Sequence, residues 1–111
     1  MKIATYLLLS SLSINKGFCM TYEEITIAPK AVLRFTAQWC GPCKALAPIF
    51  DEVAAEHPDM KTYVIDVDTY QDIAQKFGIK GIPTMMRIES GSVKMQKSGA
   101  RAKPEVEEFF K

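Results

Sequence analysis

Two cysteines separated by two residues are the part of this sequence that can do chemistry. Cys40 and Cys43 follow an apolar run, residues 31–35, and precede a long stretch of helical periodicity. This order predicts that Cys40 lies at a helix N-terminus and that Cys43 lies one turn inside the helix. Backbone N–H groups and the helix dipole stabilise an anion there, so we expect Cys40 to form a thiolate near neutral pH. A dithiol in that place can attack a disulfide with one sulfur and release the product with the other.

Length and composition indicate one small domain. The 111 residues, 48% of them hydrophobic, are enough for a core of modest size. Fourteen basic and thirteen acidic residues leave a formal net charge of +1, so we expect neither nucleic acid nor a membrane as the main partner. Three cysteines cannot form a closed framework of disulfides, and a lone Cys-x-x-Cys indicates redox or metal chemistry.

Zinc binding is the alternative use of the cysteine pair. A zinc site needs two further ligands with similar spacing, and Cys19 and His57 are the other cysteine and histidine of the sequence. His57 stands beside Pro58 at the expected end of a helix, and it has no second ligand at the spacing that a zinc site requires. We therefore expect no metal and no bound cofactor.

Residues 1–19 have three interpretations. A basic start followed by the apolar residues 3–9 resembles a secretory signal, but the run is short and no convincing cleavage site follows it. Residues 11–15 could instead be the first strand of the domain. Translation could also begin at Met20, because the codons for Lys16-Gly17 are purine-rich, like a bacterial ribosome-binding site. The sequence leaves these three interpretations open.

The hydrophobic pattern of residues 20–111 alternates between helix and strand periods. The expected elements are a helix over 21–28, a strand over 31–36, a helix over 42–56 kinked at Pro48, a strand over 62–67, a helix over 69–77 ended by Gly78, strands over 84–89 and 93–98 around a turn at 90–92, and a helix over 104–111. The first half forms a βαβ unit with parallel strands, and the second half an antiparallel hairpin with a helix. We therefore predict an α/β fold, in which helices cover both faces of a mixed sheet.

The sequence closely resembles the thioredoxin family in several motifs. These are Trp39-Cys40-Gly41-Pro42-Cys43-Lys44, Ala47-Pro48, Asp66-Val67-Asp68, Gly81-Ile82-Pro83-Thr84, Gly91 and Lys97-Ser98-Gly99-Ala100. The resemblance runs from about Met20 to Lys111 and implies the thioredoxin fold. It also implies a monomeric, cytoplasmic reductase of protein disulfides that is recharged by a thioredoxin reductase and needs no cofactor.

The resemblance also implies a role for each residue of these motifs. Cys40 would be the exposed attacking thiol, and Cys43 the buried resolving thiol. Pro83 would be in the cis form facing the disulfide, and the Ile82 backbone would pair with an extended substrate segment. The residues that shape the active site would be Trp39, Gly41, Pro42, Lys44 and Pro83. The surface that accepts the partner protein would contain Trp39, Val67, Gly81, Ile82, Pro83, Gly99 and Ala100.

Arg34 departs from the family pattern. Thioredoxins usually have a buried aspartate at this position, six residues before the first cysteine, and often a lysine in the next strand, where this chain has Val64. The usual proton acceptor for Cys43 is therefore absent. A buried lone arginine is costly, so we expect Arg34 to pair or to reach solvent, with Asp66 as the candidate partner. We also expect its charge to lower the thiolate pKa and to make the dithiol less reducing than is usual for the family.

Two other functions remain open on the sequence alone. A thioredoxin-like domain can be a binding subunit that holds a partner whatever its redox state, and the loss of the aspartate–lysine pair would then be tolerated. If residues 1–19 export the chain, the same dithiol would act in an oxidising compartment.

Overall fold

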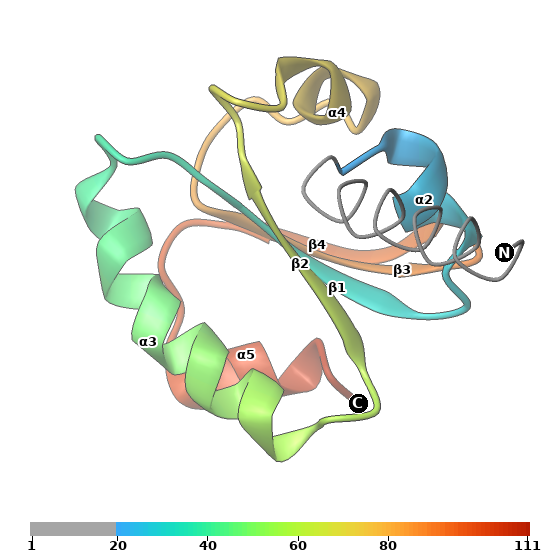
Figure 1. Cartoon of the computed structure of the whole chain (residues 1–111). Coiled ribbons are helices and arrows are strands. Elements are labelled where there is room, and N and C mark those ends of the chain that lie inside the picture. The colour runs from blue at the N-terminus through green and yellow to red at the C-terminus, as the bar shows by residue number, and fades with distance from the viewer. Residues whose placement is uncertain (1–19) are drawn as a thin grey trace, which may run out of the picture.

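A four-stranded sheet with helices on both faces forms the described part of the chain (Figure 1). The structure is a computed structural model that describes residues 20–111, so the interpretations of residues 1–19 and the position of Cys19 lie outside the described residues. The elements in chain order are α2 Tyr22–Ile27, β1 Ala31–Thr36, α3 Gly41–Glu56, β2 Lys61–Asp66, α4 Gln71–Lys76, β3 Thr84–Glu89, β4 Ser92–Ser98 and α5 Lys103–Glu108.

The strand order is β2-β1-β3-β4, and the sheet is mixed. β1 pairs with β2 in parallel, with α3 as the crossover between them, whereas β1–β3 and β3–β4 are antiparallel. The predicted α/β architecture, a βαβ half joined to a ββα half, is therefore confirmed.

The two faces of β1 explain its continuous apolar sequence. Leu33 and Phe35 contribute to a core with Ile25 of α2 and Ile73 of α4. Val32 contributes to a second core on the opposite face, which also contains Leu46, Phe50 and Val53 of α3, Val106 of α5, and Phe109 and Phe110 directly after α5. A strand that is covered on both faces has no solvent side, so it shows no polar alternation.

All four helices differ from the predicted bounds by at least one residue, and α4 and α5 differ most. α4 begins at Gln71 instead of Thr69, because the Asp66 carboxylate accepts hydrogen bonds from the amides of Asp68 (2.8 Å) and Thr69 (3.2 Å), which holds this segment in a turn. α5 ends at Glu108 instead of Lys111. The next residues continue as a tighter turn with i→i+3 hydrogen bonds.

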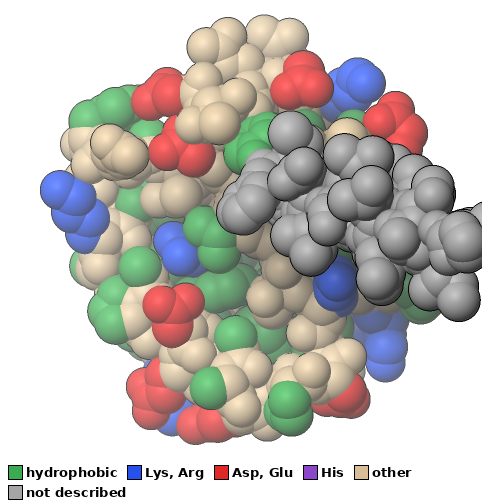
Figure 2. All heavy atoms as spheres, in the orientation of Figure 1, with side chains coloured by type: hydrophobic (Ala, Val, Ile, Leu, Met, Phe, Trp, Pro, Cys, Tyr) green, Lys and Arg blue, Asp and Glu red, His purple; other side chains and the backbone are tan. Residues whose placement is uncertain are grey.

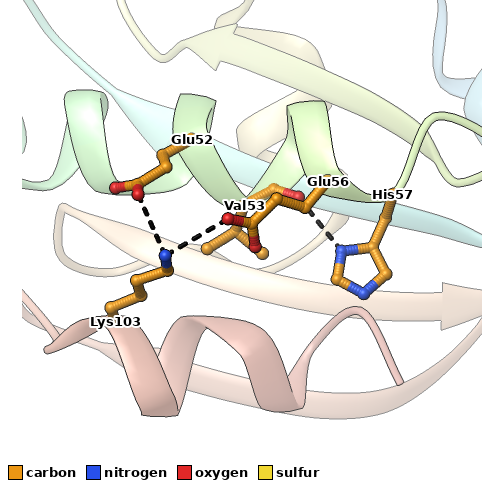
Figure 3. A network of polar contacts seen from close by, with 5 residues as sticks. All are labelled: Glu52, Val53, Glu56, His57 and Lys103. Atoms are coloured by element: carbon orange, nitrogen blue, oxygen red, sulfur yellow. Dashed lines mark hydrogen bonds and ion pairs between the residues drawn. The ribbon is translucent and has the colours of Figure 1, made fainter.

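One lysine connects α5 to α3 (Figure 3). Lys103 Nζ lies 2.9 Å from Glu52 Oε2 and 3.2 Å from Glu56 Oε2, so one ammonium group bridges two carboxylates of α3. Directly after α3, His57 Nδ1 donates to the Val53 carbonyl at 3.0 Å, which satisfies a carbonyl of the last helical turn. The Lys103 ion pairs hold the C-terminal half of α3, the helix that begins at the cysteines, against α5.

The surface carries charges of both signs. Figure 2 shows acidic and basic side chains scattered over the face that it draws, without a broad area of either sign. None of the helices within residues 20–111 has the length and apolar character that a membrane span requires.

Candidate active site

The two cysteines form a disulfide at the start of α3. Cys40 is the N-cap residue of this 16-residue helix, and Cys43 lies in its first turn. Cys40 Sγ accepts a hydrogen bond from the Cys43 backbone N–H at 3.2 Å. Pro42 occupies the first turn, where an N–H would have no partner inside the helix. The site therefore has the local geometry that stabilises a thiolate on Cys40 after reduction.

Both cysteines are buried in this disulfide form. Cys43 is 1% exposed and Cys40 is 5% exposed, so Cys40 is the more accessible of the two. Val67 and Ile82 pack against the cluster that the cysteines form with Ala37. The expectation of an exposed Cys40 is therefore not met in the oxidised form, because neighbouring side chains cover it.

Trp39 is the large exposed side chain beside the disulfide. It is 69% exposed, and its indole Nε1 donates a hydrogen bond of 2.8 Å to Asp68 Oδ2. Asp68 was not assigned a role from the sequence. A signal was available, since Asp68 follows β2, the parallel neighbour of β1, and the carboxyl ends of parallel neighbours lie at the same edge of a sheet.

The loop before β3 has the predicted cis bond between Ile82 and Pro83. Gly99 N donates to the Pro83 carbonyl at 2.7 Å, which brings the segment after β4 beside this loop. Within residues 20–111, neither the N–H nor the carbonyl of Ile82 has a hydrogen-bond partner. The Ile82 main chain is therefore available to pair with another extended chain.

A pocket of about 330 Å³ lies between Trp39 and this loop. Its lining residues are Trp39, Val67, Ala74, Ile79, Lys80, Gly81 and Ile82. Four residues of the predicted substrate surface are thus brought together, whereas Pro83, Gly99 and Ala100 lie outside this lining. Ile79 and Lys80 were missed, although they directly precede Gly81 in the sequence. Most of the lining is apolar, and Lys80 adds a positive charge.

The remaining motif residues lie at the outer side of the disulfide. Gly41, Pro42 and Lys44 are exposed at the start of α3. The start of α3 is therefore open to solvent, whereas Trp39 and the loop that contains Ile82 and Pro83 lie around the pocket described above.

Arg34 lies on β1, and its side chain packs between the sheet and α3. It is 7% exposed, and its guanidinium carbon is 5.1 Å from the centre of the Phe50 ring, a cation–π contact. The predicted ion pair with Asp66 does not form, and Asp66 Oδ1 instead accepts the two backbone N–H groups that begin the turn after β2. Burial lowers the pKa of Arg34, and the Asp51 carboxylate partly opposes this shift. β1 pairs with β2 so that Arg34 is opposite Val64, so the two departures from the family pattern are neighbours in the sheet.

A second cavity, of about 200 Å³, joins Arg34 to the active site. Its lining residues are Arg34, Thr36, Ala37, Gln38, Cys43, Lys44, Ala47 and Asp66. The buried cysteine of the pair therefore shares a cavity with a buried arginine.

Metal binding has no support in the described part of the chain. Residues 20–111 contain no group of three or more His, Cys, Asp or Glu side chains that could hold a metal ion. The chemistry of the site is that of the two sulfurs.

Comparison with known proteins points to one family. The thioredoxin family model matches residues 20–111. Thioredoxin of Pseudomonas aeruginosa is 41% identical over 77 residues, which are 68% of this chain and 71% of that protein. Thioredoxin of Mycoplasmoides gallisepticum is 39% identical over 82 residues, 74% of this chain and 82% of that one. The solved structure of Plasmodium falciparum thioredoxin matches with a TM-score of 0.74 at 27% identity, covering 80% of this chain and 87% of that one.

Proposed function

This chain belongs to the thioredoxin family, and on that basis we propose that it is a general reductase of protein disulfides in the cytoplasm. It is a dithiol–disulfide oxidoreductase whose redox-active group is the Cys40–Cys43 pair. The chemistry needs no cofactor, because the two sulfurs themselves carry the electron pair. Family membership implies disulfide-containing proteins as substrates and a thioredoxin reductase as electron donor. We propose that residues 20–111 are the working domain and that it acts as a monomer.

The reaction proceeds in two exchange steps. In the reduced enzyme, the Cys40 thiolate attacks one sulfur of the substrate disulfide, which forms a mixed disulfide and releases the other substrate sulfur as a thiolate. Cys43 then attacks the Cys40 sulfur, so the Cys40–Cys43 bond forms and the bond to the substrate breaks. The substrate gains two electrons and takes its protons from water. The enzyme is left in the disulfide form that the structure contains.

The helix start supports Cys40 as the attacking residue. Its sulfur accepts the Cys43 N–H and lies at the positive end of a 16-residue helix, so its thiolate is stabilised more than that of an ordinary cysteine. Cys43 is less accessible and comes second.

Substrate docking is supported by three features beside the disulfide. The exposed Trp39 ring gives an apolar contact, the free main chain of Ile82 can pair with an extended segment, and the pocket between them can accept a side chain. The Cys40–Cys43 disulfide next to this free strand-like backbone is the observation that carries the proposal.

Cysteine substitutions test the proposal. We expect Cys40→Ser to abolish the reduction of insulin disulfides with dithiothreitol as the electron source. Cys43→Ser should instead trap a covalent mixed disulfide with substrate, visible by mass spectrometry and lost on reduction. If both variants keep the cellular function of the chain, it is a redox-independent binding subunit and the reductase proposal is wrong.

The cellular location needs its own test. N-terminal sequencing of the natural protein, from whole cells and from the secreted fraction, identifies the first residue of the mature chain. A start at Met1 or Met20 inside cells supports the cytoplasmic proposal. A shortened chain in the secreted fraction would contradict it and make this an exported oxidoreductase.

A further inference from the structure

We propose that Arg34 is a positioning residue that stabilises the thiolate form of Cys43 across the cavity that both residues line. The inference rests on the reductase function proposed above and assigns this chain its own way of preparing the second exchange step. It is carried by the burial, the missing partners and the location of Arg34.

Arg34 is a buried cation with unused hydrogen-bonding capacity. Only 7% of the residue is exposed, and its Nε is buried with no hydrogen-bond partner. Within residues 20–111 no carboxylate forms an ion pair with it, and its guanidinium carbon lies 5.1 Å from the centre of the Phe50 ring. Keeping a cation in this position costs free energy, which an anion in the adjoining cavity would offset.

Cys43 is the group beside this cavity that can become an anion. The charged or titratable groups around it are Arg34 from β1, Asp66 from the end of β2, and Lys44 and Cys40 from α3. The Asp66 carboxylate already accepts two backbone N–H groups. The Asp51 carboxylate of α3 also acts on Arg34. Arg34 is buried whereas Lys44 is exposed, so Arg34 is the cation of this group that can stabilise a Cys43 thiolate.

Two effects on Cys43 oppose each other. Burial of a thiol raises its pKa, whereas a nearby opposite charge lowers it. A cavity of about 200 Å³ is also large enough for water, which can connect the guanidinium to the sulfur. We infer that the arginine charge outweighs burial.

The consequence is that the second step needs no protein base. Once Cys40 is held in the mixed disulfide, the Cys43 thiol loses its proton to water in the cavity and becomes a thiolate. In the mixed disulfide this thiolate attacks the Cys40 sulfur, the Cys40–substrate bond breaks, and the substrate sulfur leaves as a thiolate. Because the reduced form is stabilised, the dithiol is also a weaker reductant than it would be without Arg34.

The first test measures the ionisation of Cys43 alone. In a Cys19→Ser, Cys40→Ser background, Cys43 is the only cysteine of the full chain, and the ultraviolet absorbance of its thiolate can be followed against pH. We expect a pKa below the ordinary cysteine value of about 8.5. Arg34→Met should raise it by about one unit or more, and Arg34→Lys, which keeps the charge, should restore most of the effect.

A second arginine provides the matched control. Arg87 is also 7% exposed and lies in the same sheet, but it contacts the Phe109 carbonyl and Glu89 and is not among the residues that line the cavity beside Cys43. Arg87→Met should leave the Cys43 pKa unchanged, which separates the effect of this one charge from that of removing any buried arginine.

The second test follows the exchange step itself. In Cys19→Ser protein, a chromophoric aromatic thiol is placed on Cys40 as a mixed disulfide, and its release by Cys43 is timed against pH. The midpoint of this profile should move upward in Arg34→Met by the same amount as the pKa. The reduction potential should become more negative, by about 30 mV for each tenfold change in the equilibrium constant.

Two results would overturn the inference. One is a Cys43 pKa at or above about 8.5 with Arg34 in place, a measurement that does not depend on how any Arg34 variant folds. The other is a folded Arg34→Met protein in which the pH profile of thiol release matches that of the protein with Arg34. Either result leaves the reductase proposal intact if insulin is still reduced, whereas an inactive wild-type chain would reject the proposed function and not this ionisation.

Discussion

Trp39 Nε1 donates a hydrogen bond of 2.8 Å to Asp68 Oδ2, although both residues are exposed and 29 positions apart. The bond fixes an exposed indole at the edge of the disulfide, so that the ring is in place before a substrate arrives. An ordered aromatic contact loses less conformational entropy on binding than a mobile one.

Removal of the Asp68 carboxylate should weaken substrate binding more than chemistry. We expect Asp68→Ala to raise KM for insulin a few-fold with a smaller change in kcat, whereas Asp68→Asn keeps an acceptor and should stay near the wild type. Trp39 is the only tryptophan, so its fluorescence should report a more mobile indole in Asp68→Ala. Equal KM values for the alanine variant and the wild type would show that the bond does not position the ring for binding.

The two buried arginines should respond in opposite ways to replacement by methionine. The Nε atoms of both arginines are unpaired, but Arg34 also has no ion pair among the described residues, so Arg34→Met should leave the free energy of unfolding unchanged or raise it. Arg87 donates to the Phe109 carbonyl at 2.8 Å and pairs with Glu89 at 3.1 Å, so Arg87→Met should lower it by about 1–3 kcal/mol. Urea unfolding of both proteins checks this, and a larger loss for Arg34→Met would contradict it.

The Lys103 bridge should make stability depend on pH in the alkaline range. Hydrogen bonds to Glu52 and Glu56 raise the pKa of Lys103 above its ordinary value of 10.5. A raised lysine pKa stabilises the fold fully below the unfolded value, and this contribution disappears as the pH rises through the folded value. The wild type and Lys103→Met should therefore differ in unfolding free energy at neutral pH and converge at high pH. Because the ion pairs are exposed, high salt should also reduce the difference, and a gap that is constant with pH would contradict this account.

The hairpin turn offers a stabilising substitution away from the site. Ser90 has φ 50° and Gly91 has φ 83°, the pair of positive values that a two-residue loop of this type requires. Asparagine tolerates a positive φ better than serine does, so Ser90→Asn should raise the unfolding free energy by a few tenths to about 1 kcal/mol. Thermal unfolding measures the change. Ser92→Asn, beyond the loop at the start of β4, is the matched control and should give no gain.

Local sequence pattern was enough to predict most of the elements. β1 and β3 have the predicted bounds, β2 is shifted by one residue and β4 begins one residue earlier, because the strand signal comes from neighbouring apolar residues. The bounds of α4 and α5 were less well predicted. The start of α4 depends on Asp66, whose side chain accepts hydrogen bonds from the backbone amides that would otherwise begin the helix. Such a competition between a side chain and the helix is not visible in hydrophobic periodicity.

The sequence by itself determined the chemistry of this protein and the place of the cysteines. A Cys-x-x-Cys between an apolar strand and an amphipathic helix leads to a dithiol at a helix N-terminus, since both depend on neighbours along the chain. The tertiary structure alone decided that Trp39 bonds to Asp68, that Lys80 joins the pocket beside it, and that Arg34 lies against Phe50 instead of pairing with Asp66. These contacts join residues that are distant in sequence, and the packing of α3 on the sheet and competition from backbone N–H groups determine which of them form.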